Sequence, residues 1–327
     1  MKKYKVLSVC RALRVSRTNQ YQFQTPRPKR YRKSSDPGVL SSILSITQAR
    51  ATYGYKRVSA LVNRKRRLEQ ENPWNKKRIL RVMQINHLVL QKAEIKPKRP
   101  HLGQVITMRS NLRYCSDIFE IKCWNGERVH VAFSLDCHDR ETMKFVAEKR
   151  HLIHQDIMRL IDETVTHRFG EFIEKLPHPI QWLSDQGPQY TAYETKKYGE
   201  SWGFDVRTTP AYSPESNGMA EAFVKLFKRD YVYTHELWTA ESVLRQLPEW
   251  FKDYNENHPH SGLGYQSPLD YKNTVSDVSG LPETAEQEAE RADCLQPGWA
   301  QENLEQFDRQ RQTVLLQPNS AEQKLSV

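Results

Sequence analysis

Three acidic residues stand where their side chains could meet at one end of a β-sheet. Asp117 begins an alternating stretch over 117–123, Asp185 directly follows the short apolar stretch 180–184, and Glu221 falls one turn into a helical stretch. Thirty-five residues separate Asp185 from Glu221. Carboxylate oxygens with open water positions suit Mg²⁺ or Mn²⁺. Two such ions about 3.5–4 Å apart could stabilise the attacking and leaving oxygens of a phosphodiester displacement.

The elements that must position these carboxylates alternate between strand and helix. The strand at 117–123 turns back at Asn125-Gly126, a strong hairpin signal, into a strand at 129–135. The remaining predicted elements are a strand at 144–147, a helix at 154–169, a strand at 180–184, a helix at 191–202, a strand at 204–208 and a helix at 217–231. This order predicts an α/β domain with a mixed five-stranded sheet and flanking helices. If its first and fourth strands are neighbours, about 4.8 Å apart, Asp117 and Asp185 can share ions.

Other carboxylates compete for this role, because a single acidic residue is more often a surface charge than a metal ligand. Asp136 and Asp139 lie near the end of the second predicted strand, and Glu215 lies in the loop before the last helix. Asp136 could support the ligands without binding an ion itself. From the residues alone, these alternatives stay open.

The charge of the chain is divided very unevenly along its length. Residues 1–104 contain 26 Lys and Arg but only 4 Asp and Glu, a net charge of +22. Residues 105–272 have a net charge of −5, and residues 273–327 one of −6. A polyphosphate, with nucleic acid as the default, is the simplest partner for such a basic front end. Charge alone does not distinguish DNA from RNA.

A helix-turn-helix fragment is predicted at 1–24. Apolar residues recur at helical spacing at Val6, Val9, Cys10 and Leu13. Ser16 can cap a second helix, whose start carries side chains of the types that contact base edges and phosphates, namely Arg17, Asn19 and Gln20. The alternative is an amphipathic hairpin with solvated charges. A basic linker with two prolines follows at 25–35.

A second DNA-binding domain, helical and of the helix-turn-helix or winged-helix-like type, is predicted at 36–92. Apolar periodicity indicates a helix around 39–46, another after Tyr53-Gly54-Tyr55, and a third capped by Asn75. Its predicted DNA contacts are Lys56, Arg57, Arg64, Arg66 and Arg67. The alternative is a helical bundle with a solvated basic face. A basic linker at 93–106 then leads to the domain at 107–272, and the acidic tail at 273–327 is expected to be mostly disordered.

Several classes of protein are disfavoured by composition. With 38% hydrophobic residues, the chain can bury a core, so wholesale disorder is not expected. Apolar runs are far shorter than the roughly 18 residues of a membrane-spanning helix, and no signal-peptide pattern follows the first lysines. Five cysteines without a CxxC pair favour reduced thiols over disulfides or a zinc ribbon. A cytoplasmic protein is expected.

Three sequence blocks, at 184–190 (SDQGPQY), 213–221 (SPESNGMAE) and 254–268 (YNENHPHSGLGYQSP), resemble the signature of a known family. They are similar to blocks of bacterial insertion-sequence transposases with a retroviral-integrase-type catalytic core, and most of all to the second-reading-frame protein. The resemblance extends over roughly residues 1–272. It implies a ribonuclease-H-like fold with Asp117, Asp185 and Glu221 as the catalytic, metal-binding triad. The gap of 29 from Asp185 to Glu215 does not match the family pattern.

The resemblance also implies a bacterial, nucleoid-associated location, an activity and partners. The expected enzyme is a DNA transposase that carries out metal-dependent 3′-end cleavage and strand transfer with Mg²⁺ or Mn²⁺, two ions in all. Its expected partners are the terminal inverted repeats, target DNA, further copies of itself, and an upstream helix-turn-helix protein to which it is fused or bound. Lys225 and Lys228 share a helical face with Glu221 and are expected to contact DNA. His258 and His260 are expected to be structural.

Two alternative functions use the same fold. One is a DNA-binding regulator of transposition that does not cut. The other is a ribonuclease-H-like nuclease without strand transfer. Metal-dependent cutting separates the transposase from the regulator, and joining of a 3′ end to a target separates it from the nuclease.

Overall fold

The computed structural model describes residues 6–15, 33–90, 107–209 and 217–278. Residues 25–32 of the first predicted linker and the whole second linker lie outside these residues. So do the second helix of the N-terminal fragment and nearly all of the acidic tail. In the parts of the chain that the structure describes, no helix has the length and apolar character needed to cross a bilayer. At the N-terminus, α1 (Val6–Ala12) is a short helix that buries Cys10.

Residues 33–90 form three helices: α3 (Asp36–Ala49), α4 (Tyr55–Leu68) and α5 (Lys76–Ile85). They share one apolar core that includes Ile43, Val58 and Ile79. The Asn75 side chain accepts a hydrogen bond from the Lys77 amide and caps α5, as predicted. No strand occurs within residues 33–90, so the described part of this domain has three helices without a wing.

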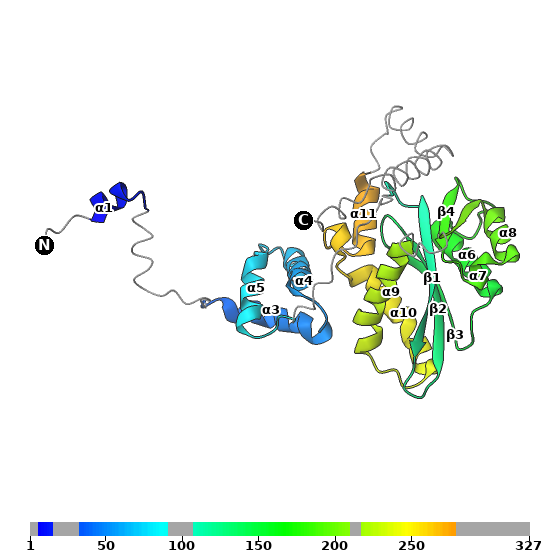
Figure 1. Cartoon of the computed structure of the whole chain (residues 1–327), viewed down its shortest axis with the longest axis horizontal. Helices are drawn as coiled ribbons and strands as arrows, with labels where there is room; N and C mark the ends of the chain where they lie inside the picture. The colour runs from blue at the N-terminus through cyan, green and yellow to red at the C-terminus, as the bar shows by residue number, and fades with distance from the viewer. Residues whose placement is uncertain (1–5, 16–32, 91–106, 210–216, 279–327) are drawn as a thin grey trace, which may run out of the picture. The chain divides into compact units, whose positions relative to one another are not determined.

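The catalytic-domain candidate contains one five-stranded sheet in the order β3-β2-β1-β4-β5. Its strands are β1 (Arg113–Lys122), β2 (Arg128–Asp136), β3 (Thr142–Glu148), β4 (Ile180–Ser184) and β5 (Phe204–Thr208). β1, β2 and β3 pair in antiparallel fashion, whereas β4 and β5 run parallel to β1. The first and fourth strands are therefore neighbours, and the sheet has the ribonuclease-H-like order (Figure 1).

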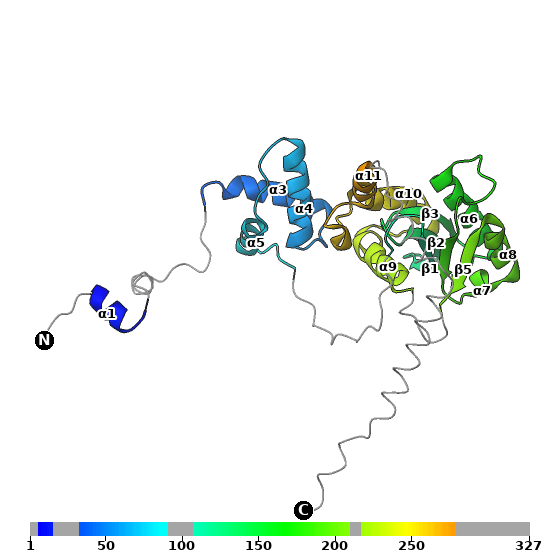
Figure 2. The ribbon, with the colours of Figure 1, turned by 90° about the horizontal axis from the view of Figure 1, so that it is seen from above.

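Helices cover both faces of this sheet. One face packs against α9 (Gly218–Asp230) and α10 (Ala240–Asn257), with the side chains of Cys115, Phe119 and Ile121 in the shared core. The other face packs against α6 (His154–Phe169), α7 (Pro188–Thr191) and α8 (Tyr193–Trp202) through Tyr114 and Trp182 (Figure 2). Because side chains alternate along a strand, Asp117 of β1 lies on the α9 face and Ser116 on the α7 face.

The described elements continue to residue 278. They are η2 (Val232–Thr234), η3 (Ser261–Leu263) and α11 (Pro268–Val278). The predicted helix at 191–202 corresponds to α8, which begins at Tyr193. A separate short helix, α7, precedes it, because Ala192 adopts an extended conformation (φ −52°, ψ 136°) between the two.

Candidate active site

Asp117 is placed by the middle of β1. It lies opposite Phe133 of β2, and its Oδ1 accepts a hydrogen bond from the Ile118 amide at 2.8 Å. On the other side, the parallel register pairs Cys115 with Leu183. Asp117 and Asp185 each lie two residues beyond this last pair of the β1–β4 ladder. Asp185 therefore follows the carboxyl end of β4, on the strand next to the one that carries Asp117.

Asp185 is held by the tight turn that follows β4. Its Oδ1 accepts a hydrogen bond from the Gly187 amide at 3.0 Å. A Cβ at Gly187 would lie 3.0 Å from Asp185 Oδ1 and 3.1 Å from Gln189 Oε1, so a side chain here would push the carboxylate. The Gln186 side chain donates a hydrogen bond from Nε2 to the Thr209 carbonyl at 2.9 Å and fixes the turn to the end of β5.

Glu221 lies in the first turn of α9, where a negative charge is favoured by the helix dipole. Its side chain is 39% exposed and accepts a hydrogen bond from Lys225 Nζ at 3.0 Å. The predicted DNA contact Lys225 is therefore engaged by the carboxylate itself.

The charges of Asp185 and Glu221 both act on Asp117. The pKa of Asp117 is raised to about 6, mainly by burial, with smaller contributions from these two charges. The Ile118 amide and the Lys228 ammonium act in the opposite direction. Lys228 Nζ lies 5.7 Å from the Phe119 ring centroid, which places this cation beside the strand that carries Asp117. Because its ionised form is destabilised in this way, the Asp117 carboxylate is strongly stabilised when a cation binds next to it.

Comparison with known proteins agrees with this geometry. Two models of an integrase core domain match residues 108–214 and 203–268. Over 270 residues, the chain is 38% identical to the transposase InsD of insertion element IS2A/D/F/H/I/K from Escherichia coli, covering 80% of this chain and 89% of that protein. The InsD transposase of IS2-9 from Escherichia coli strain K12 is also 38% identical, over 80% of this chain and 87% of that protein.

The chain belongs to the insertion-element transposases with an integrase core. Its resemblance to solved structures is weaker. A simian T-cell lymphotropic virus intasome in complex with the PP2A regulatory subunit B56 gamma has a TM-score of 0.43 at 14% identity, over 71% of this chain and 73% of that one.

The donor chemistry of the transposase site suits a hard divalent cation. Asp117, Asp185 and Glu221 offer only carboxylate oxygens, the ligands that Mg²⁺ and Mn²⁺ prefer. Among the described residues, no three His, Cys, Asp or Glu side chains are grouped closely enough to hold an ion in this arrangement. Glu221 is paired through its Oε2 with Lys225.

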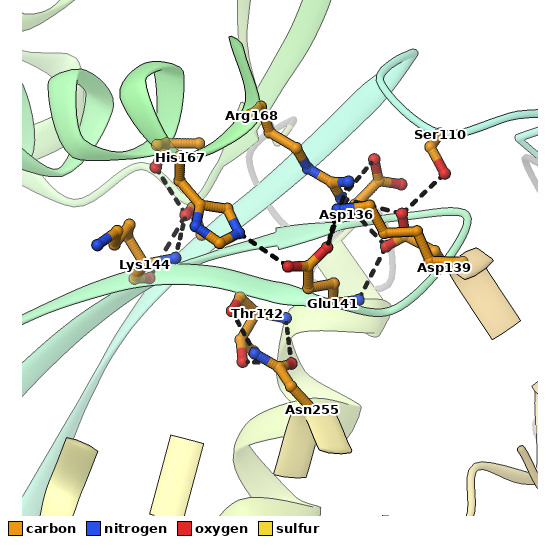
Figure 3. A network of polar contacts seen from close by, with 12 residues as sticks. Ser110, Asp136, Asp139, Glu141, Thr142, Lys144, His167, Arg168 and Asn255 are labelled. Atoms are coloured by element: carbon orange, nitrogen blue, oxygen red, sulfur yellow. Dashed lines mark hydrogen bonds and ion pairs between the residues drawn. The ribbon is translucent and has the colours of Figure 1, made fainter. Parts of the chain in front are cut away.

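The competing carboxylates Asp136 and Asp139 belong to a separate, buried network (Figure 3). Asp136 accepts hydrogen bonds from the amides of Asn111 and His138, and both aspartates contact the Arg168 guanidinium at 3.3 and 2.9 Å. Burial raises the pKa of Asp136 to about 7, with Asp139 as the next cause. These contacts give Asp136 and Asp139 a structural role at the end of β2.

Glu141 completes this network. It pairs with Arg168 at 3.2 Å, His167 at 2.8 Å and Lys272 at 2.8 Å. Although burial opposes ionisation, the hydrogen bond from His167 and the charge of Arg168 hold the pKa of Glu141 at about 2. The sequence analysis did not single out Arg168 or Glu141, since only the fold brings α6 beside the β2–β3 turn.

The five predicted DNA contacts of α4 differ in their surroundings. Arg57 and Arg64 form ion pairs within the chain, with Asp230 at 3.2 Å and Asp270 at 3.0 Å. Arg66 stacks on Trp74, with its guanidinium carbon 3.9 Å from the ring centroid. Lys56 and Arg67 are exposed. DNA contact by all five stays a prediction, and Arg17, Asn19 and Gln20 lie outside the described residues.

The two histidines of the 254–268 block lie in structural positions. His258 is fully buried, and its Nδ1 is 2.9 Å from the Tyr53 hydroxyl. His260 Nδ1 accepts a hydrogen bond from the Gly262 amide at the start of η3. Neither histidine forms part of a three-ligand metal cluster with other described residues.

Proposed function

We propose that this transposase cuts the 3′ ends of its insertion element and joins them to target DNA, with Asp117, Asp185 and Glu221 as its catalytic triad. The observation that carries the proposal is the electrostatic coupling of residues from three separate elements. Beside the larger effect of burial, Asp185 in the turn after β4 and Glu221 on α9 both raise the pKa of Asp117 on β1. A cluster of partly exposed acids in an otherwise basic protein fits a site that works on a polyanion through bound cations.

Asp117, Asp185 and Glu221 would hold two Mg²⁺ or Mn²⁺ ions. When bound, these ions supply charge stabilisation to the attacking and leaving oxygens of an in-line phosphodiester displacement. Within the chain, the amides of Ile118 and Gly187 orient the two aspartates. Lys225, released from Glu221, becomes free to bind a DNA phosphate on the same helical face as Lys228.

The same residues serve both steps. Water attacks the phosphodiester at the element end first, leaving a 3′-hydroxyl, which then attacks a phosphodiester of the target. No covalent protein intermediate is required, because each step is a direct displacement.

The proposed partners are double-stranded DNA and other proteins of the same system. The +22 charge of residues 1–104 supports binding of the terminal inverted repeats by Lys56, Arg57, Arg64, Arg66, Arg67, Arg17, Asn19 and Gln20. Two element ends must be joined in one reaction, so a homo-multimer on DNA is proposed. An upstream helix-turn-helix protein, fused or associated, would complete the N-terminal fragment.

The test uses a labelled duplex that carries the DNA flanking the gene, together with a target plasmid and Mg²⁺ or Mn²⁺. Wild type is compared with Glu221→Gln, each with and without the upstream protein. We expect metal-dependent joined product from wild type and none from the variant. Cutting without joining would support the nuclease. Binding without cutting, even with the upstream protein, would support the regulator. Equal cutting by both proteins would refute the assignment of Glu221.

A further inference from the structure

Ser116, the residue before Asp117, is a buried polar residue that contacts both of the other segments of the triad. It is fully buried on the α7 face of β1, opposite to the face of Asp117. A buried hydroxyl must find a hydrogen-bond partner. The partner it finds is not on a neighbouring strand but on the segment that carries Asp185.

The Ser116 hydroxyl lies 2.6 Å from the hydroxyl of Tyr190. Tyr190 lies on α7, five residues after Asp185, and is 1% exposed. Burial raises the pKa of Tyr190 well above its usual value, and the next charges to raise it are those of Asp117 and Asp185. The bond therefore joins β1 to the Asp185 segment right beside both carboxylates.

The Ser116 carbonyl accepts a hydrogen bond from Asn217 Nδ2 at 3.2 Å. Asn217 is 4% exposed and immediately precedes α9, four residues before Glu221. Its Oδ1 is buried and has no hydrogen-bond partner among the described residues. The hydrogen bond from Nδ2 thus links the residue before α9 directly to β1.

We propose that Ser116, Tyr190 and Asn217 form a positioning set that determines how far apart the three catalytic carboxylates stand. The Ser116 side chain fixes the segment of Asp185, and its carbonyl fixes the helix of Glu221. None of the three touches the reacting atoms; they act by holding Asp117, Asp185 and Glu221 at the separation that two ions require. A misplacement of about 1 Å at such a site can cost about 100-fold in rate.

The chain offers a matched control on the neighbouring strand. Ser134 of β2 lies directly opposite Ser116, is equally buried, and its hydroxyl lies 2.7 Å from Thr164 Oγ1 of α6. This pair also joins a strand to a covering helix through two hydroxyl groups. Neither hydroxyl bonds to the segment of Asp185 or to α9 among the described residues, so loss of their bond should affect folding but not the metal site.

The test compares Tyr190→Phe with Thr164→Val in the joining assay, with DNA saturating and Mg²⁺ varied. Tyr190→Phe should raise the Mg²⁺ concentration for half-maximal rate several-fold and lower kcat about 10-fold or more. KM for DNA should stay unchanged, and Mn²⁺, which tolerates poorer geometry, should restore part of the rate. Thr164→Val should lower the melting temperature about as much as Tyr190→Phe does. The Mg²⁺ concentration for its half-maximal rate should stay that of wild type.

Two further variants keep the proposal falsifiable if Tyr190→Phe folds poorly. Ser116→Ala removes the same bond, so the double variant with Tyr190→Phe should be no slower than either single variant. Asn217→Asp keeps the size of the side chain but sets an acceptor against the Ser116 carbonyl, and should be at least as slow as Asn217→Ala. Wild-type Mg²⁺ dependence and kcat in all of these variants, or equal losses in Thr164→Val, would overturn the proposal.

This inference rests on the proposed function, and the two fail differently. If wild type does not join DNA under any condition, the proposed function fails. If wild type joins DNA and the positioning variants behave like Thr164→Val, the proposed function stands and the positioning set does not.

Discussion

Tyr53 and His258, 205 positions apart in the sequence, share a 2.9 Å hydrogen bond in a buried network. Tyr53 precedes α4 in the three-helix domain, and His258 follows α10 in the integrase core. Beside them, Asp230 accepts hydrogen bonds from Thr52 at 2.7 Å and Arg57 at 3.2 Å. Residues 52–57 of the three-helix domain thus contact Asp230 and His258 of the integrase core in one polar junction.

Loss of this junction should weaken the whole unit. Tyr53→Phe leaves the buried Nδ1 of His258 without its partner, and the Nε2 of the same ring already has none among the described residues. We expect the free energy of unfolding to fall by about 1–3 kcal/mol. Urea denaturation of the full chain measures it. The control is Tyr55→Phe, at a half-exposed tyrosine whose hydroxyl has no partner among the described residues. Equal stability of both variants would contradict the assigned role.

The buried acidic network around Arg168 should be among the most sensitive structural positions. The Arg168 side chain is 2% exposed and pairs with Asp136, Asp139 and Glu141. Arg168→Met leaves these carboxylates without their shared cation, and we expect a loss of about 3–5 kcal/mol. Arg159→Met is the control. Arg159 pairs with Glu148 but is 48% exposed, so its loss should stay under about 1 kcal/mol. Chemical denaturation that shows similar losses for both would contradict the account.

The turn after β4 should tolerate no side chain at Gly187. A Cβ there meets Asp185 Oδ1 at 3.0 Å and Gln189 Oε1 at 3.1 Å. Gly187→Ala should therefore displace the Asp185 carboxylate and reduce the joining rate by about 10- to 100-fold. Gly38→Ala is the matched control, since no atom lies within 4 Å of its added Cβ and it lies in α3, where Ala is favoured. Full activity of Gly187→Ala would show that the Asp185 carboxylate does not depend on the absence of a side chain at position 187.

The pH dependence of the reaction should report on Asp117. Its carboxylate binds metal only when deprotonated, so with a pKa of about 6 the rate should fall as the pH drops through that range. Lys228 lowers this pKa. Lys228→Met should therefore move the acid limb of the rate profile to higher pH, while Lys252→Met, at an exposed position on α10, should leave it in place. A shift to lower pH, or none, would contradict the placement of Lys228 beside Asp117.

Local sequence patterns were sufficient to predict most of the core. Helix 154–169 and strands 180–184 and 204–208 have the predicted bounds, because periodicity and flanking turn residues agree there. The break at Ala192 carries no local signal, since alanine favours helix. Helix α10 was not predicted: Thr239 caps it and apolar residues follow at helical spacing, but Pro248 lies inside it and argues against a helix.

The sequence was sufficient to name the residues of the candidate site but not their contacts. The spacing and order of the motif blocks pointed to Asp117, Asp185 and Glu221. The pairing of Glu221 with Lys225 could have been predicted, because oppositely charged residues at i and i+4 of a helix are neighbours. The bonds of Ser116 to Tyr190 and Asn217 were not, because they span 74 and 101 positions and depend on strand register. The same holds for Arg57 and Arg64, whose acidic partners lie more than 170 positions away.

The central claim is that Asp117, Asp185 and Glu221 form one metal-dependent site for cutting and joining DNA. Its most direct test is the amount of joined product formed in Mg²⁺ and in Mn²⁺ by Asp117→Asn, Asp185→Asn and Glu221→Gln, beside wild type and Glu215→Gln. Each triad variant keeps the size of the side chain and loses its charge. We predict product from wild type and Glu215→Gln, and a loss of at least about 1,000-fold in each triad variant, with DNA binding retained. Joined product at the wild-type level from any triad variant would contradict the claim. So would loss of product in Glu215→Gln if the triad variants stay active.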